Sequence, residues 1–237
     1  MTTKKSKNKN FFALSTLLVT FALLWTLNNI FVEGNYQLLW LTIPIVILLS
    51  GVESMYYHRF LAHKSWDCPK WLEIIFITIS TGFHFLPAMF WAGGHRKHHR
   101  FNDGEGDIQG PTVSVIQNIK LVLGDVIVSP RYMLDMIDNT LLRIQLSFYW
   151  LLLITFGVIW SLIFGFDSYM YIILIQKITT FSFLYISHIG GARNNYWASA
   201  IMLNSEYLHK RHHEQSSNPY FGGFDIWYYT IVKHFPK

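Results

Sequence analysis

Long apolar runs divide the chain into segments that are long enough to cross a lipid bilayer. A membrane-spanning helix needs roughly 20 mainly apolar residues, because its backbone amides must be paired within the segment at about 1.5 Å of rise per residue. Four runs meet this requirement, at residues 11–32, 36–57, 146–166 and 168–188. The links within the first pair and within the second pair of runs are very short, so each pair is predicted to form a helical hairpin.

A fifth apolar stretch, residues 71–92, is harder to assign from hydropathy. It contains Glu73, Gly82, His84 and Pro87. Because a proline and a charge interrupt it, the stretch could span the membrane, re-enter it or lie along the interface.

The placement of basic residues favours a four-span topology. Of the 19 Lys and Arg residues, four precede the first run, nine lie between His58 and Arg143, five follow His188, and Lys177 is inside the fourth run. Four spans therefore place 18 of the 19 on one side, which the positive-inside rule assigns to the cytoplasm. A full crossing by residues 71–92 would destroy this asymmetry, so we expect that stretch to be re-entrant or interfacial.

This topology predicts an integral, multi-pass membrane protein with both termini in the cytoplasm. Residues 1–237 are expected to form one domain, and residues 1–10 a basic cytosolic tail. No small-residue cleavage site precedes Glu33, which favours a retained first span over a cleaved signal peptide.

The composition agrees with this class of protein. The chain is 51% hydrophobic and 14% charged, which excludes an ordinary soluble globule, a disordered chain and a nucleic-acid-binding arm. The net charge of +5 is explained by topology, so no nucleic-acid partner is expected. The single cysteine, Cys68, excludes an intramolecular disulfide and any metal site built from several cysteines.

Eight of the eleven histidines fall in three short motifs: HRFLAH at 58–63, HRKHH at 95–99 and HKRHH at 209–213. Positions i, i+3 and i+4 share one stripe of an α-helix, so each HxxHH motif is predicted to place three imidazoles on one face. His58 and His63 would lie about 140° apart on such a helix, so we expect the second span to end or bend there.

The three motifs lie next to predicted spans and on the same predicted side, which favours convergence over a solvated His-rich surface. Imidazole binds iron, zinc, copper and nickel, and one zinc takes four ligands, so eight histidines indicate two metal ions. A zinc hydrolase of the HExxH type is not supported, since the His213-Glu214 pair lacks a second histidine at the required spacing.

In this order, and separated by apolar hairpins, the motifs resemble the three histidine boxes of membrane-bound fatty acid desaturases. The HxxxxH spacing of the first is similar to the acyl-CoA (Δ9-type) branch. The resemblance implies an all-α integral membrane fold, with four transmembrane helices and a cytosolic helical cap that holds two iron ions. It also implies O2-dependent introduction of a double bond into an acyl chain carried by CoA, a carrier protein or a lipid.

The same resemblance identifies His188 as a ninth ligand and Glu206 as a residue that supports the site. In the family, an asparagine four residues before this histidine reaches one iron through water, whereas Leu184 occupies that position here. Ser187 or Asn194 could compensate. Ser205 replaces a usual glycine, which marks a divergent member. The predicted metal-binding and catalytic residues are His58, His63, His95, His98, His99, His188, His209, His212 and His213.

Four carboxylates are candidates for orienting these imidazoles by accepting a ring N–H: Glu53, Asp103, Asp107 and Glu206. Lys177, inside the fourth run, could snorkel or pair with Glu53, or it could make a polar contact in a substrate tunnel. His84 and His234 match no family ligand and are expected to be structural or interfacial.

Several alternatives stay open. The boxes also suit an acyl or alkane hydroxylase or an acetylenase, and a membrane protein that binds metal without redox chemistry is a further alternative. Desaturation consumes two external electrons, so we expect a ferredoxin or a cytochrome b-type donor. Basic residues around the boxes could dock such an acidic partner: Arg59, Lys64, Lys97, Arg100, Lys210 and Arg211.

Overall fold

The computed structural model describes residues 2–102, 104–109, 114–197 and 202–237. Within these ranges the regular structure is helical and no β-strand occurs, which confirms the predicted all-α class. The main helices are α1 (Thr2–Phe31), α2 (Leu39–Val52), α3 (Lys70–Gly82), α4 (Ala88–Phe101), α5 (Val115–Val122), α6 (Thr140–Phe164), α7 (Phe166–Ile186), α9 (His209–Glu214) and α10 (Ile226–Thr230). A π-helix, η1 (Glu53–Ala62), continues α2, and short 3-10 turns are η2 (Pro130–Tyr132), η3 (Leu134–Met136), η4 (Ser205–Leu208) and η5 (Val232–His234).

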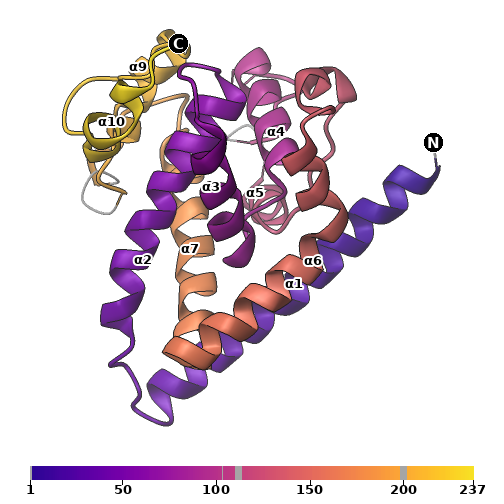
Figure 1. Cartoon of the computed structure of the whole chain (residues 1–237), viewed down its shortest axis with the longest axis vertical. Coiled ribbons are helices and arrows are strands. Elements are labelled where there is room, and N and C mark those ends of the chain that lie inside the picture. Colours follow the sequence, from indigo (N-terminus) through magenta and orange to yellow (C-terminus); the bar gives the residue numbers. More distant parts are fainter. Residues whose placement is uncertain (1, 103, 110–113, 198–201) are drawn as a thin grey trace.

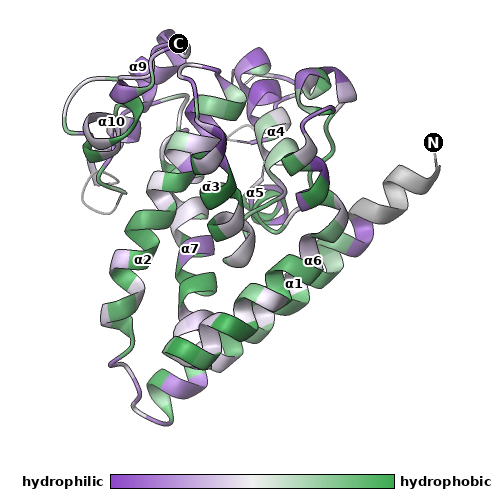
Figure 2. Cartoon of the chain, viewed as in Figure 1, coloured by the Kyte–Doolittle hydropathy of each residue, from purple (hydrophilic) through white to green (hydrophobic). Residues whose placement is uncertain are grey.

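In the described part of the chain, four helices are long and apolar enough to cross a membrane, as predicted: Lys9–Phe31, Leu39–Ala62, Thr140–Phe164 and Phe166–Ile186. Figure 2 shows their apolar surface, whereas polar residues gather at the end of the bundle that carries α9. The bounds differ from the prediction in three places. The predicted basic tail is already helical from Thr2, the second span continues through η1, and the third begins at Thr140. Asn139 sets that start, because its side-chain oxygen accepts the Leu141 and Leu142 amides.

Close contacts hold α6 against α7 in the second hairpin and join this hairpin to the first. Gly165, at a positive φ of 86°, is the only residue between α6 and α7, and this conformation favours glycine. Gly157 of α6 faces Tyr169 of α7, where a Cβ atom would lie 2.8 Å from the tyrosine ring. Figure 1 shows that the α1–α2 and α6–α7 links lie at the end of the bundle away from α9. The Asp167 carboxylate, in the first turn of α7, accepts the indole N–H of Trp25 of α1 at 2.8 Å.

The stretch predicted at residues 71–92 is two helices rather than one. Helix α3 ends at Gly82, and α4 begins after Pro87 and runs on through the second histidine motif. His84 lies in the break with a positive φ of 62°, and its ring contacts the hydroxyls of Ser15 and Tyr149. His84 is therefore a packed structural residue, whereas the depth of α3 and α4 in a bilayer stays a prediction.

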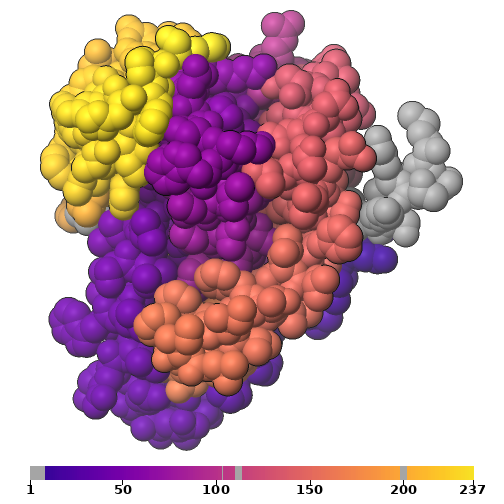
Figure 3. All heavy atoms as spheres, viewed as in Figure 1, coloured from indigo at the N-terminus to yellow at the C-terminus, as the bar shows by residue number. Residues whose placement is uncertain are grey.

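The segments after α7 form a cap over the end of α2 and η1. Figure 3 shows the C-terminal segment packed against the part of the chain that follows α2. The Asp67 amide donates to the Phe235 carbonyl at 3.0 Å, and the Trp227 ring lies against Gly51. This packing places the third histidine motif above the first.

Candidate metal centre

The first histidine motif lies at the end of the π-helix η1, where His63 directly follows the last helical residue, Ala62. Its hydrogen bonds run from residue i+5 to residue i, and the His63 amide donates to the His58 carbonyl at 3.0 Å. Residues five apart therefore face nearly the same way, and the two imidazoles lie 4.9 Å apart between ring centroids. The prediction that the helix ends at this motif is confirmed, since η1 ends at Ala62, and the π-helical winding turns the two rings to the same side.

The second and third motifs lie on α4 and α9, as the HxxHH spacing predicts. Each helix, however, serves two separate groups of histidines. Helix α4 gives His95 and His99 to one group and His98 to the other, whereas α9 gives His212 to the first and two residues to the second. The prediction that each motif places three imidazoles on one face therefore needs one addition. The three imidazoles of each helix are divided between two neighbouring groups.

All nine predicted histidines fall in these two groups, and within each group the ligand-capable atoms lie within 4.8 Å of one another. We call them the five-histidine group and the four-histidine group. They comprise His58, His63, His95, His99 and His212, and His98, His188, His209 and His213, respectively. The groups adjoin, because the rings of His99 and His213 stack with centroids 4.4 Å apart.

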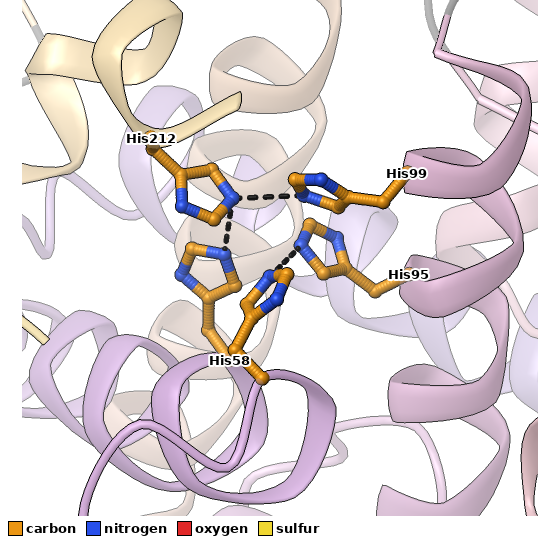
Figure 4. Close-up of side chains that lie close together, drawn as sticks. His58, His95, His99 and His212 are labelled. Carbon is orange, nitrogen blue, oxygen red and sulfur yellow. Dashed lines mark hydrogen bonds between the residues drawn. The ribbon is translucent and has the colours of Figure 1, made fainter. Parts of the chain in front are cut away.

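The imidazoles point their Nε2 atoms inward. In the five-histidine group, His212 Nε2 lies 2.9 Å from His58 Nε2 and 2.8 Å from His99 Nε2, as Figure 4 shows. In the four-histidine group, His188 Nε2 lies 2.9 Å from the Nε2 atoms of both His98 and His209. Around an ion about 2.0–2.1 Å from each nitrogen, adjacent nitrogens lie about 3 Å apart, so this spacing fits metal coordination.

Hydrogen bonds on the opposite ring nitrogen fix the tautomer of several histidines. His98 Nδ1 donates to Asp107 at 2.7 Å, and His58 Nδ1 donates to Glu206 at 2.8 Å. His188 Nδ1 donates to the Leu184 carbonyl at 2.6 Å, and that oxygen can only accept. These rings therefore present an Nε2 lone pair, and facing lone pairs repel each other unless a cation lies between them. The donor set fits a pair of metal ions.

Burial and the neighbouring imidazoles lower the pKa of several of these histidines. Desolvation is the main cause that lowers the pKa of His188 to about 4 and that of His213 to about 3, with nearby histidines adding to it. The same causes hold the pKa of His95 and His212 well below the usual histidine value. At neutral pH these rings are neutral and able to act as ligands.

The carboxylate candidates have different placements. Glu206 also accepts the Ser54 hydroxyl at 2.6 Å, and although burial raises its pKa, His58 and Arg59 bring that pKa below its usual value. Asp107 is buried against His98, whereas Asp103 lies outside the described residues. Glu53 does not contact a ring nitrogen of the groups, because its described partners are the Trp91 indole and the Thr180 hydroxyl.

Sequence reasoning missed several residues around the site. The Asn102 side-chain oxygen accepts the His213 Nδ1–H at 2.7 Å. Asn102 follows the last residue of α4 and has a left-handed backbone conformation, with a φ of 42°. Arg59 was predicted to face a donor protein, but it is fully buried and donates to Asp225 at 2.6 Å. The burial of Arg59 could not be predicted from the residues around it, because its partner Asp225 is far along the chain.

The predicted replacements for the missing asparagine have other described partners. Leu184 orients His188 through its backbone carbonyl, and its side chain lines the cavities beside the site. The Ser187 hydroxyl accepts the Asn195 amide at 3.4 Å, and the Asn194 oxygen accepts the Lys210 amide.

A mainly apolar cavity opens beside the five-histidine group. His95 and the Trp91 ring that stacks on it, with centroids 5.0 Å apart, belong to its wall. Lys177 also lines this cavity, which agrees with the expectation that it could make a polar contact in a substrate tunnel. Among the described residues, no ion pair joins Lys177 to Glu53.

Comparison with known proteins gives relatives that are named as desaturases. The chain is 28% identical over 187 residues to an sn-1 stearoyl-lipid 9-desaturase of Synechocystis sp., covering 71% of this chain and 58% of the relative. It is 24% identical over 209 residues to an sn-1 stearoyl-lipid 9-desaturase of Anabaena variabilis, covering 77% and 74%. A Delta-9 desaturase-like 5 protein of Arabidopsis thaliana is 25% identical over 199 residues, covering 74% and 66%.

The chain is thus similar, over about three quarters of its length, to proteins named as Δ9-type lipid desaturases. No protein-family model matches it. It spans less than two thirds of the length of the Synechocystis and Arabidopsis relatives. Its four long apolar helices are those of a membrane protein, and its two histidine groups could each hold a metal ion.

Proposed function

We propose that the chain is an O2-dependent di-iron desaturase that introduces a double bond into a fatty acyl chain. The observation that carries this proposal is the convergence of nine Nε2 atoms in two adjoining groups of five and four. The names of the relatives, as lipid desaturases, support an acyl-lipid substrate over acyl-CoA or an acyl carrier protein.

The two histidine groups would hold one iron ion each. When bound, these ions would supply the activation of O2 that removal of two hydrogens from a methylene pair requires. The protein's own residues prepare the site. Glu206 and Asp107 hold imidazoles in the tautomer that presents Nε2, and apolar residues exclude water from the cavity beside His95.

The cavity beside the five-histidine group is the proposed acyl-binding site. Phe85, Leu86 and Phe90 contribute part of its apolar wall, which suits a hydrocarbon chain. His95 and Trp91 join this wall to the histidine group, so a chain in the cavity would present its methylenes to the site.

We further propose that the site faces the cytoplasm and receives electrons from a separate donor, a ferredoxin or a cytochrome b-type protein. Lys210, Arg211 and Arg100 are exposed near α9 and the end of α4, and they would attract an acidic partner. Of the other predicted docking residues, Lys64 forms an ion pair with Asp135 at 2.7 Å, and Arg59 is buried and cannot contact a donor protein. A donor-dependent rate that falls steeply with added salt is the expected result.

The test combines metal analysis with product analysis on purified protein in nanodiscs. Anaerobically purified protein should hold two irons per chain, and with octadecanoyl lipid, O2, ferredoxin and ferredoxin reductase it should form a double bond that mass spectrometry locates. His98→Ala should lose iron and product together, whereas exposed His234→Ala should retain both.

Each other outcome selects a different function. A hydroxylated product would establish the hydroxylase alternative, because both reactions use the same site. A triple bond would establish the acetylenase. Zinc or loosely held metal, with no product in the presence of donor and O2, would contradict the redox proposal and favour metal binding alone.

A further inference from the structure

We infer that the cap inserts part of its surface into the lipid bilayer, in the leaflet on the side of the histidine groups. The inserted part is the α10 segment, which we define as residues 224–233, and its lipid contacts are Phe224, Ile226 and Tyr229. The inference goes beyond the proposed function, because it holds whatever reaction the histidine groups support.

The depth of the α10 segment follows from its contact with the second span. The Trp227 ring lies directly against Gly51, within the apolar helix Leu39–Ala62. A hydrocarbon core about 30 Å thick is crossed by about 20 helical residues, so a core that begins at Leu39 extends past Gly51. Figure 1 shows the same relation, with α10 beside the upper part of α2 and α9 above it. Trp227 is therefore level with the lipid chains.

The outer face of the α10 segment is apolar. The exposed fractions are 58% for Phe224, 37% for Ile226 and 45% for Tyr229. Asp225, the one acidic residue in 224–233, is turned inward and fully buried in its pair with Arg59. Large apolar side chains that are exposed together beside a spanning helix continue its lipid-facing surface, because lipid removes them from water.

The polar groups of the α10 segment have partners within the protein. The Trp227 indole N–H donates to the Met202 carbonyl at 3.2 Å, and the Thr230 hydroxyl donates to the Ile226 carbonyl at 2.7 Å. The Tyr229 hydroxyl is 2.8 Å from the hydroxyl of a neighbouring tyrosine. Lipid chains offer no hydrogen-bond partners, so internal pairing of this kind is what insertion requires.

The surface of α9 has the opposite character. Its exposed side chains are charged, at Lys210, Arg211 and Glu214, which is typical of a surface in water. Between the two surfaces in character is the end of the α10 segment, where the Lys233 ammonium lies 5.6 Å from the centroid of the Tyr229 ring. Such a pair suits the membrane–water interface, because tyrosine and lysine keep an apolar part in lipid and a polar end among the headgroups.

Spin labels in nanodiscs test the inference on the full chain. Single-cysteine variants are made in a Cys68→Ser background: Phe224→Cys and Ile226→Cys on the α10 segment, Ile43→Cys on the exposed face of α2, and Gln215→Cys after α9. Collisions with O2, which partitions into lipid, are compared with collisions with a nickel chelate, which stays in water. Labels at 224 and 226 should favour O2 over the chelate, as the label at 43 does, whereas the label at 215 should favour the chelate.

Two results would overturn the inference. Labels at 224 and 226 that match the label at 215 would place the α10 segment in water. Labels at these positions that exclude both probes would show that protein covers this face, for example a second copy of the chain.

Hydroxyl-radical footprinting of the unsubstituted chain in nanodiscs gives a second test that does not depend on any variant. Phe224 and Tyr229 should be oxidised severalfold more slowly than after transfer to unfolding conditions, because lipid shields them, although both are exposed on the protein itself. His234, which is exposed beyond the segment, is the control and should change little. Unchanged oxidation of Phe224 and Tyr229 would contradict the insertion.

Discussion

The Nδ1 atom of His58 lies 2.8 Å from the Glu206 carboxylate, although the two residues are 148 positions apart. Glu206 belongs to η4, which leads directly into α9. One short segment therefore orients a ring of the five-histidine group and also begins the helix that carries His209, a member of the four-histidine group. A displacement of this segment would therefore move residues of both histidine groups.

Replacing Glu206 by Gln should weaken metal binding by about 10- to 100-fold, because the amide no longer provides an anionic acceptor for the His58 ring N–H. Chelator competition on the purified protein measures this affinity. Glu214→Gln, on the exposed end of α9, is the matched control and should leave it unchanged. Equal affinities in the two variants would refute the orienting role.

Replacing Leu184 by Asn should raise the metal affinity of the four-histidine group several-fold. The variant keeps the backbone carbonyl that accepts His188 Nδ1, and it adds a polar side chain at a buried position beside the site. Leu184→Ala, which removes the side chain without adding a polar group, is the control. If the affinity of Leu184→Asn does not exceed that of the control, the lost asparagine contact has no energetic role here.

The sequence was sufficient for the parts of the fold that depend on local pattern. Apolar runs of the required length predicted the four spans, and the HxxHH spacing predicted helical placement of both motifs. It was insufficient where the backbone departs from α-helical winding, because nothing in the residues 58–63 distinguishes an i+5 ladder from a helix end. The backbone hydrogen bond from His63 to His58 identifies the π-helix, and it explains why the two side chains belong to one histidine group.

Long-range partners of the site were predicted only where a resemblance named them. Glu206 was anticipated in this way. The buried pair of Arg59 and Asp225 was not, because two charged residues so far apart in sequence each have the pattern of an exposed surface residue. Tertiary packing, not local sequence, removes them from water.

Asp225→Asn should destabilise the protein by about 3 kcal/mol, since it removes the nearer of the two carboxylates that pair with the fully buried Arg59 guanidinium and leaves only Glu206, at 3.6 Å. Asparagine preserves the side-chain oxygen that caps α10 by accepting the Tyr228 amide, so the loss reports the ion pair. Asp135→Asn breaks partly exposed pairs with Lys64 and Arg96 and should cost about 1 kcal/mol or less. Thermal unfolding in detergent should therefore show a clearly larger fall in Tm for Asp225→Asn, and equal falls would contradict the assignment.

Cys68 should react slowly with thiol reagents in the folded protein. Burial raises the pKa of its thiol from 9.0 to about 12, and the nearby Glu73 carboxylate adds to this. Because the thiolate is the reactive form, a shift of this size lowers the reactive fraction about a thousandfold at pH 8. The rate of alkylation by iodoacetamide, followed by intact mass, should rise about tenfold per pH unit from pH 7 to 9 in the folded protein. In the unfolded chain the rise should level off towards pH 9, where its ordinary thiol titrates. At each pH it should be far slower in the folded protein than after unfolding in guanidinium, which serves as the control with the same single cysteine. Similar rates before and after unfolding would show that the Cys68 thiol is neither buried nor perturbed.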